Sequence, residues 1–422
     1  MVAEKTPPAP PPERAPVTDW KTDYEIFDAG YIKDPFPVWD EIRSSECPVA
    51  HSDRHLGSWM PTRYEDLFAI AQDIQHFSSR DVLVAPFGVE QGYEPEEGQE
   101  FAEVAAPPIT ADPPLHTWTR KLLLPPFSMK SVAKWEQLTR DHCNDLIDAF
   151  IEKGECDGAI EYAQQIPPYV IAAMLGVEKG MVPTFTEWVR EVLEQGFANP
   201  EAAAQARIQM LTFLWGHIQD RRANPGDDLI SYLAQAEVDG APIPDQHILG
   251  TGFLIVVAGI DTTWSSIGSA LWHLAQNPAD RQHIIDHPEM VNTAIEELLR
   301  AYSPVTMARY VAEDVDYKGC PMKEGERVVM NFPAANRDPE KFPDADKVVI
   351  DRAKNPHIAF GAGIHRCAGS NLARMEMRVS VQEFLRRIPD FELADPENVT
   401  WAGGQVRGPR SMRVKFPAGG KA

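Results

Sequence analysis

The spacing of apolar side chains predicts that helices form most of this chain. From His116 to Gln276, apolar residues recur every three to four positions, with interruptions mainly near Gly and Pro, which is typical of helices that bury one face. The segment Pro244 to Gln276 would run roughly 45 Å at the rise of an α-helix, long enough to span the molecule. Shorter helices are predicted at Asp34 to Ile42 and at Arg63 to Phe77.

Short strands are predicted mainly after Ser303. Apolar stretches bounded by Gly and Pro turns favour strands at Tyr310 to Tyr317, Arg327 to Phe332 and Met412 to Phe416, and His51 to Pro61 favours a hairpin near the N-terminus. We therefore expect a mainly α fold with a minor β part.

The interior of the chain indicates one folded unit. Its 422 residues would allow two or three domains at roughly 150 residues each, but no internal stretch is rich enough in Pro, Gly or Ser to be a linker. The N-terminal MVAEKTPPAPPPERAP lacks the basic start and apolar run of a signal peptide, and its prolines favour extended polyproline II. We predict a disordered tail over residues 1–16 and a single domain over residues 17–422.

A long irregular segment runs from Ser78 to Thr110. It is rich in Gly, Pro and Glu, and a loop of this length in a compact protein is usually functional or disordered. Its apolar residues Val82, Leu83, Val84 and Phe87 suggest a lid over a substrate.

The charge of the chain excludes some partners. With 63 acidic and 40 basic side chains, the formal charge is −23, which argues against binding to nucleic acid or to an anionic membrane surface. The most apolar stretch, Phe253 to Ile260, is far shorter than the ~20 residues that cross a bilayer. We expect a cytoplasmic monomer without a nucleic-acid or membrane partner.

One cysteine stands apart from the other four. The cysteines are odd in number and widely spaced, which disfavours a disulfide framework or a zinc ribbon and suggests a reducing compartment. They are Cys47, Cys143, Cys156, Cys320 and Cys367. Cys367 lies in the Gly-rich string FGAGIHRCAG, from Phe360 to Gly369, directly before the predicted helix Ser370 to Phe384.

The surroundings of Cys367 favour a reactive or ligating sulfur. Glycines let a backbone approach a large flat ligand, and a helix N-terminus lowers the pKa of a nearby thiol. Two alternatives remain at this point. The cysteine is a buried structural residue, or the glycines form a dinucleotide loop, although that motif would require a third glycine where Arg366 stands.

A second string, AGIDTT from Ala258 to Thr263, interrupts the long apolar helix with residues of low helix propensity. Gly259 would let a ligand lie against the helix. Thr262 can bond a carbonyl one turn back and open a groove, and Asp261 can relay protons. The alternative is a packing glycine beside a solvated Asp–Thr edge.

Two further patterns place charged side chains on helix faces. Glu297 and Arg300 are three residues apart and can pair, although such a pair is by default an exposed ion pair. His116 and Arg120 are four residues apart on a helix that begins near Pro113, so their side chains lie on the same face of that helix. The alternative is that both are ordinary solvated polar residues.

These strings together resemble the cytochrome P450 family. The haem-binding signature F-G-x-G-x-H-x-C-x-G is filled at its six fixed positions, the acid–alcohol pattern is present, and the E-x-x-R pair falls between the two in the family's order. The resemblance extends over about Asp34 to Phe416. It implies a cytochrome P450 fold of the soluble bacterial type, with the long central helix over the distal face of a haem.

The resemblance also implies roles for individual residues. Cys367 would be the axial thiolate of haem b iron, Asp261 and Thr262 the catalytic acid–alcohol pair, and Glu297 with Arg300 a structural pair. The other contacts that it implies with the haem and its propionates come from His116, Arg120, Gly259, Arg309, Phe360, His365 and Gly369.

An apolar substrate pocket is expected from chain position. The residues expected to line it are Val82, Leu83, Phe87, Phe185, Trp188, Val192, Leu254, Val257, Ala258, Val305, Met307 and Val406. Because no Arg or Lys stands out as a carboxylate anchor, we expect a small lipophilic substrate such as a terpenoid, an aromatic compound or a fatty acid.

The activity implied is that of a monooxygenase that inserts one oxygen atom of dioxygen. No flavin or iron–sulfur domain is fused, so separate ferredoxin and ferredoxin reductase partners are implied, with Lys121, Arg366 and Arg374 steering an acidic ferredoxin. Three alternatives fit the sequence less well. A haem sensor or gas carrier would not need Asp261 and Thr262, a peroxide-driven enzyme would lack that pair, and an NAD-type dehydrogenase is disfavoured by the glycine spacing.

Overall fold

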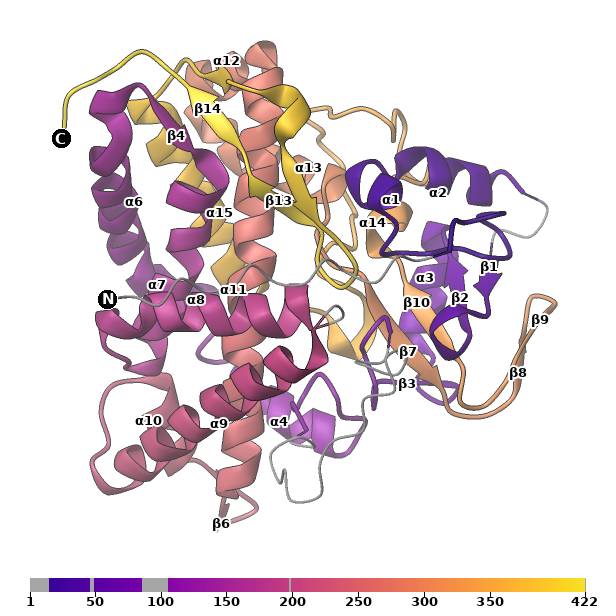
Figure 1. The fold of residues 1–422 in the computed structure, drawn as a ribbon. Coiled ribbons are helices and arrows are strands. Elements are labelled where there is room, and N and C mark those ends of the chain that lie inside the picture. The colour runs from indigo at the N-terminus through magenta and orange to yellow at the C-terminus, as the bar shows by residue number, and fades with distance from the viewer. Residues whose placement is uncertain (1–14, 46–48, 86–104, 197–198, 422) are drawn as a thin grey trace.

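Helices form most of the protein, and the predicted mainly α fold with a minor β part is confirmed (Figure 1). The computed structural model describes residues 15–45, 49–85, 105–196 and 199–421. Its α-helices are α1 Ala29–Lys33, α2 Phe36–Arg43, α3 Tyr64–Gln72, α4 Leu115–Leu123, α5 Met129–Val132, α6 Glu136–Phe150, α7 Ile166–Leu175, α8 Val182–Arg190, α9 Pro200–Ala223, α10 Leu229–Gln235, α11 Asp245–Gln276, α12 Pro278–Asp286, α13 Val291–Ala301, α14 Phe332–Ala335 and α15 Ser370–Arg387.

The long helix α11 runs through the middle of the molecule (Figure 1). It has 32 residues, begins after Pro244 and ends at Asn277, where Pro278 cannot continue it and starts α12 instead. By length and hydropathy α11 could cross a bilayer, but 72% of its most apolar window is buried within the fold. It packs against α7, α9 and α15, which makes it the central core helix.

The strands form one larger sheet and several small ones. The larger sheet has the order β1-β2-β10-β7-β3, and β14 lies between β11 and β4 in a second sheet. Their bounds are β1 Val49–Ser52, β2 Ser58–Pro61, β3 Phe77–Ser78, β4 Glu155–Asp157, β5 Glu237–Val238, β6 Ala241–Pro242, β7 Met307–Val311, β8 Val315–Tyr317, β9 Cys320–Met322, β10 Arg327–Met330, β11 Glu392–Leu393, β12 Thr400–Ala402, β13 Gly408–Ser411 and β14 Arg413–Lys415. The hairpin predicted at His51 to Pro61 is the antiparallel pair β1–β2.

The buried apolar residues form three clusters. The largest buried cluster joins α4 to α13 with α15, a second joins the five-stranded sheet to α3, and a third lies under α1 and α2. In Figure 1 the five-stranded sheet stands beside the helical part, through which α11 runs.

Two predicted boundaries were wrong. The segment Tyr310 to Tyr317 is two strands, because after Val311 the backbone turns and β8 pairs with β9 in a separate hairpin. The helix predicted to reach Phe77 ends at Gln72, since Asp73 closes it and Phe77 pairs with Val311.

The ends of the predicted irregular segments are only partly described. The carbonyl groups of Ala15 and Pro16, which we placed in the tail, accept hydrogen bonds from Arg54 at 2.9 and 3.2 Å. The rest of that tail, Cys47, and Phe87 with most of the segment Ser78 to Thr110 lie outside the described residues.

Candidate functional site

A cavity of about 790 Å³ lies between α11 and the string from Phe360 to Gly369. Cys367 and Thr262, which are far apart in the sequence, both line it. Most of its lining is apolar, and its size is that of a pocket for a large ligand or for a ligand with its cofactor. The cavity therefore joins the two strings that the sequence singled out.

The loop before α15 presents the sulfur of Cys367 to this cavity. Gly361 and Gly363 have φ values of 71° and 67°, and a Cβ on Gly363 would collide with the carbonyl oxygen of Ala71. Glycine is therefore required there for both conformation and space. The N–H of Cys367 donates to the carbonyl of Phe360 at 2.8 Å, which fixes the turn that precedes α15.

The pKa of the Cys367 thiol is set by opposing effects. Burial raises it above its usual range, whereas the N–H of Gly369 and the guanidinium groups of Arg120, Arg366 and Arg374 act to lower it. Cys367 is open to the cavity, and a cation that takes the place of the thiol proton would stabilise the charged sulfur, so this cysteine suits a metal ion better than it suits free thiolate chemistry.

A cluster of cationic and imidazole groups lies beside the sulfur. The rings of His116 and His365 are 4.3 Å apart between centroids, and within the described residues neither Nε2 atom has a hydrogen-bond partner. Arg120 and Arg309 line the same end of the cavity. Burial lowers the pKa of His365 to about 3, with Arg309 contributing, and burial lowers the pKa of Arg309 itself to about 10.

This cluster fits an anionic ligand. Two arginines and two neutral imidazoles can donate to carboxylate oxygens, and their burial leaves little water to compete. The two propionates of a haem would meet them while its iron lies at the sulfur of Cys367. The residues present therefore fit a haem.

Thr262 lies on the cavity wall opposite this loop. Its hydroxyl donates to the carbonyl oxygen of Ala258 at 2.8 Å, as predicted for a bond one turn back. Gly259 also lines the cavity, but a Cβ there would point at Ile171 of α7. The glycine thus serves the close packing of α7 on α11, and our expectation that it makes room for a ligand was incomplete.

Asp261 faces away from the cavity and is buried. Its Oδ1 accepts from Arg410 Nη2 at 2.7 Å and from Ser265 Oγ at 3.2 Å, and Arg410 also pairs with Glu194. Burial raises the pKa of Asp261 to about 6, against the lowering effect of Arg410. With 1% of its surface exposed, Asp261 has no direct path to solvent, so the alternative of a solvated edge is wrong.

Sequence reasoning missed Arg410 and Glu194. Arg410 lies in β13, and Glu194 lies in the π-helical turn Glu191–Gln195 that follows α8. A Cβ on Gly408 would collide with Ser265, so glycine allows β13 to approach α11 and Arg410 to reach Asp261. No local spacing could reveal a contact between segments so distant in the chain.

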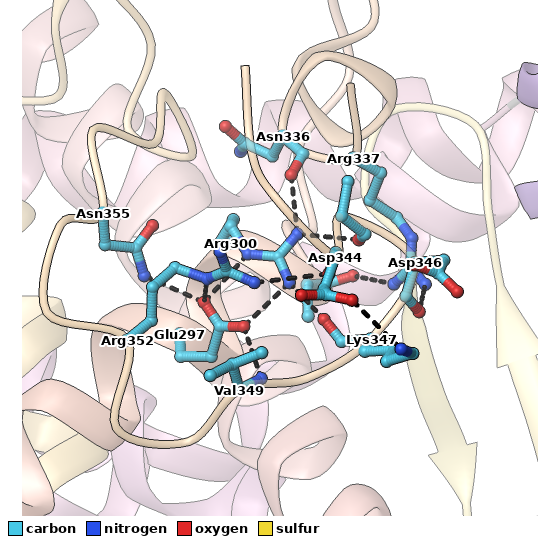
Figure 2. A network of polar contacts seen from close by, with 12 residues as sticks. Glu297, Arg300, Asn336, Arg337, Asp344, Asp346, Lys347, Val349, Arg352 and Asn355 are labelled. Carbon is cyan, nitrogen blue, oxygen red and sulfur yellow. Dashed lines mark hydrogen bonds and ion pairs between the residues drawn. The ribbon is translucent and has the colours of Figure 1, made fainter. Parts of the chain in front are cut away.

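Glu297 and Arg300 form a buried ion pair within a network of polar contacts (Figure 2). Arg300 donates to both of its carboxylate oxygens at 2.8 Å, and Arg352 and the N–H of Val349 donate at 2.9 and 2.8 Å. Burial acts to raise the pKa of Glu297, but these donors outweigh it and hold the pKa below the usual range. The alternative of an exposed ion pair is wrong, since both side chains have an exposed fraction of 0%.

The predicted substrate pocket largely coincides with the cavity. Its lining includes Val82, Leu83, Val192, Leu254, Val257, Ala258, Val305, Met307 and Val406. The prediction that Phe185 and Trp188 line the pocket was wrong, because both pack with Phe213 in the core. Phe87 lies outside the described residues.

Arginines in the lining contradict one expectation. We expected no basic anchor for a carboxylate, but Arg80 and Arg207 line the cavity in addition to Arg120 and Arg309. Arg207 was missed because on α9 it has no special spacing, and only packing against α11 turns it inward.

One of the three predicted docking cations is not available. Arg374 donates to Glu296 at 2.5 and 2.8 Å and lies over the ring of Phe360 at 4.3 Å, so its charge is balanced within the fold. Lys121 and Arg366 are exposed.

Comparison with known proteins agrees with the resemblance. Residues 169–400 match the family model of cytochrome P450. The polyketide biosynthesis cytochrome P450 PksS of Bacillus subtilis is 32% identical over 390 residues, which cover 90% of this chain and 96% of that protein. The mycinamicin IV hydroxylase/epoxidase of Micromonospora griseorubida is 32% identical over 385 residues, which cover 89% and 94% of the two chains.

Solved structures confirm the predicted fold. The structure of PksS has a TM-score of 0.83 at 30% identity and covers 93% of this chain and 99% of its own. That of CYP101J2 has a TM-score of 0.84 at 26% identity, with coverages of 96% and 100%. P450BioI, solved with an acyl carrier protein that bears hexadec-9Z-enoic acid, has a TM-score of 0.81 at 26% identity, with coverages of 92% and 99%.

Proposed function

We propose, from the premise that this chain belongs to the cytochrome P450 family of haem-thiolate monooxygenases, that it inserts one oxygen atom of dioxygen into a small lipophilic substrate. The observation that carries this proposal is the shared cavity, with Cys367 on one wall and Thr262 on the other. Bound haem supplies the activation of dioxygen and the oxygen transfer.

The residues at the Cys367 end would hold this cofactor, which we propose is haem b. Cys367 would be the iron ligand, and Arg120, Arg309, His116 and His365 would donate to the propionates. This assignment gives the partnerless Nε2 atoms of the two histidines an acceptor. It also offsets the burial of two guanidinium groups by two carboxylates.

Thr262 and Asp261 would manage protons. The hydroxyl of Thr262 is held in place by the carbonyl of Ala258 and would order a water molecule in the cavity. Asp261, whose pKa of about 6 lets it exchange protons near neutrality, would resupply them by turning from Arg410. The apolar lining would keep bulk water away from the reaction.

A lipophilic substrate follows from the lining of the cavity. One relative is named a mycinamicin IV hydroxylase/epoxidase, and a Mycobacterium bovis relative is named a methyl-branched lipid omega-hydroxylase. Both names describe oxygen insertion, and the second names a lipid as the molecule oxidised, which supports this class of reaction for the present chain.

Separate electron donors would dock near the N-terminus of α15. Lys121 and Arg366 are exposed there, and exposed Leu124 and Met129 lie on the adjoining segment, whose Phe127 carbonyl accepts from Asn371 of α15. An acidic ferredoxin, supplied by its reductase, would suit this cationic and apolar surface. We propose that the chain works as a cytoplasmic monomer, with residues 17–422 as one domain.

The test is the spectrum of the reduced protein with carbon monoxide. We expect the red-shifted Soret band of thiolate-ligated haem, and we expect Cys367→His to lose that band while still binding haem. His142→Ala, which changes a histidine remote from the cavity, serves as a control. A wild-type spectrum of histidine-ligated haem would refute the role of Cys367.

A further inference from the structure

We infer that Gln405 determines how apolar ligands fit the cavity, because its side-chain amide fixes the wall formed by Val82 and Leu83. This inference rests on the proposed monooxygenase function and adds to it a positioning residue that selects the lipophilic substrate. Gln405 lies between β12 and β13, lines the cavity and has an exposed fraction of 7%. None of the sequence patterns described above includes it.

Residues 82–85 form a wall of the cavity without forming a strand. Val82 and Leu83 line the cavity, whereas Val84 and Ala85 are buried in the third apolar cluster, under α1 and α2. A buried segment outside a strand ladder must find other hydrogen-bond partners for its backbone groups. The conformation of this wall therefore depends on those partners.

Gln405 bonds to the backbone on both sides of Leu83. Its Oε1 accepts from the N–H of Val84 at 3.1 Å, and its Nε2 donates to the carbonyl oxygen of Val82 at 3.2 Å. One amide group thereby takes the place of a neighbouring strand. The two amide atoms are assigned by their partners, because a rotated amide would set N–H against N–H and carbonyl against carbonyl.

The other backbone contacts of the wall lead to the five-stranded sheet. The N–H of Ala308 in β7 donates to the same carbonyl oxygen of Val82 at 2.9 Å. The N–H of Leu83 donates to Asp81 at 3.1 Å, and Asp81 pairs with Arg327 of β10. These contacts tie the wall to the sheet, whereas the amide described above ties it to the C-terminal part of the chain.

The backbone around Gln405 holds the amide in position. The carbonyl oxygen of Gln405 accepts from the N–H of Thr306 at 3.0 Å. Gly404, directly before it, has a φ of 81°, and a Cβ there would collide with the ring of Phe27, so this turn requires glycine. The amide therefore reaches residues 82–84 from a fixed frame.

Loss of the amide should loosen the wall and so weaken its contact with a ligand. The buried N–H of Val84 would lose its acceptor, which is unfavourable unless the segment shifts or admits water. Val82 and Leu83 would then no longer be held against an apolar chain, whose binding depends on close contact with the lining. Gln405 thus acts on the ligand through these two side chains.

Binding of imidazole and of 1-hexylimidazole to the holoenzyme tests the inference. Both ligands bind haem iron through a ring nitrogen and shift the Soret band, but only the second places an alkyl chain in the cavity. The ratio of the two Kd values therefore measures the fit of the chain. The wild type should bind 1-hexylimidazole more tightly by roughly a hundredfold or more. Gln405→Met keeps the length of the side chain and removes the amide, and it should lower this ratio roughly tenfold while imidazole binding changes by less than about twofold.

A double-mutant cycle shows whether Gln405 acts through the wall. Leu83→Ala should itself lower the ratio roughly tenfold, and adding Gln405→Met should then change it by less than about threefold, because a truncated wall leaves little to position. Hydrogen exchange of the Val84 amide should be faster in Gln405→Met than in the wild type. Gln165→Met is the matched control, since Gln165 is half-buried and also bonds to backbone, at Ile160, but lies outside the cavity. It should change neither measurement.

Three results would overturn the inference: a wild-type ratio in Gln405→Met, independent effects of the two substitutions in the double variant, or unchanged hydrogen exchange at Val84. If Gln405→Met fails to fold, Gln405→Asn, whose amide is one carbon shorter, carries the same expectations. The carbon monoxide spectrum of the same preparations reports on the proposed function separately. A normal thiolate band with an unchanged ratio would refute the role of Gln405 alone, whereas a missing band in the wild type would refute the haem-thiolate function.

Discussion

Glu376 provides the sharpest test of the energetics of this fold. It lies on α15 with an exposed fraction of 0%, and within the described residues neither of its carboxylate oxygens has a hydrogen-bond partner. Burial raises its pKa well above the usual range, so we expect a neutral acid in the folded protein. Unfolding would expose it, and above pH 4.5 it would then release its proton.

The size of this effect follows from proton linkage. Because the unfolded chain binds fewer protons than the folded chain, stability falls as the pH rises above the unfolded pKa, by about 1.4 kcal/mol per pH unit, until the folded pKa is reached. Between pH 5 and pH 7 the loss from this one residue is therefore at most about 2.6 kcal/mol. Glu376→Gln stays neutral in both states and should remove this loss.

Urea unfolding of the holoenzyme at pH 5, 6 and 7, followed by tryptophan fluorescence, would measure the difference. Between pH 5 and pH 7 the free energy of unfolding of the wild type should fall relative to that of Glu376→Gln, by up to about 2.6 kcal/mol. Glu397→Gln, at an exposed position, should run parallel to the wild type. Parallel curves for Glu376→Gln as well would show that the carboxyl is ionised or partnered in the folded protein and would refute the reasoning.

Three further predictions concern the site and its support. Thr262→Ala should still consume electrons but form less product per NADPH consumed, measured with a reconstituted electron donor. Thr262→Ser should restore the wild-type ratio of product to NADPH. An unchanged ratio in Thr262→Ala would refute the proposed role of the hydroxyl. Glu297→Gln should cost about 3–5 kcal/mol in urea unfolding, because it leaves buried guanidinium groups uncompensated, and a loss below 1 kcal/mol would contradict this. Arg410→Leu should raise the pKa of Asp261 above about 6, so the pH midpoint of turnover should move upward, and a fixed midpoint would separate Asp261 from proton supply.

The sequence predicted the parts of the site that are encoded locally. The string around Cys367 is a continuous turn, and its glycines are demanded by positive φ values and by the close approach of Ala71. The AGIDTT string was likewise visible, because its low helix propensity conflicts with the apolar helix around it. Periodicity located α11 to within one residue of its N-terminus.

The contacts that could not be predicted join distant segments. Arg410 reaches Asp261 only because β13 packs on α11, and Arg374 pairs with Glu296 only because α13 packs on α15. Arg207 reads in the sequence as an ordinary helix-surface arginine, yet packing turns it into the cavity. Each error in the predicted charges of the site comes from such a packing event.

The packing of three helices also explains how the site keeps its dimensions. Cys367 lies three residues before α15, and α15 packs directly on α11, which carries Thr262. The distance between the sulfur and the hydroxyl is therefore set by helix–helix contact and not by a loop.

The third helix, α13, packs on both α15 and α11 and holds the Glu297 network, whose donors Val349 and Arg352 belong to the segment that leads toward Cys367. Weakening that network should therefore loosen the loop from Phe360 to Gly369, which carries Cys367, before it disturbs α11. We expect Glu297→Asp to broaden the Soret band of the ferric protein and to leave the far-UV circular dichroism spectrum unchanged.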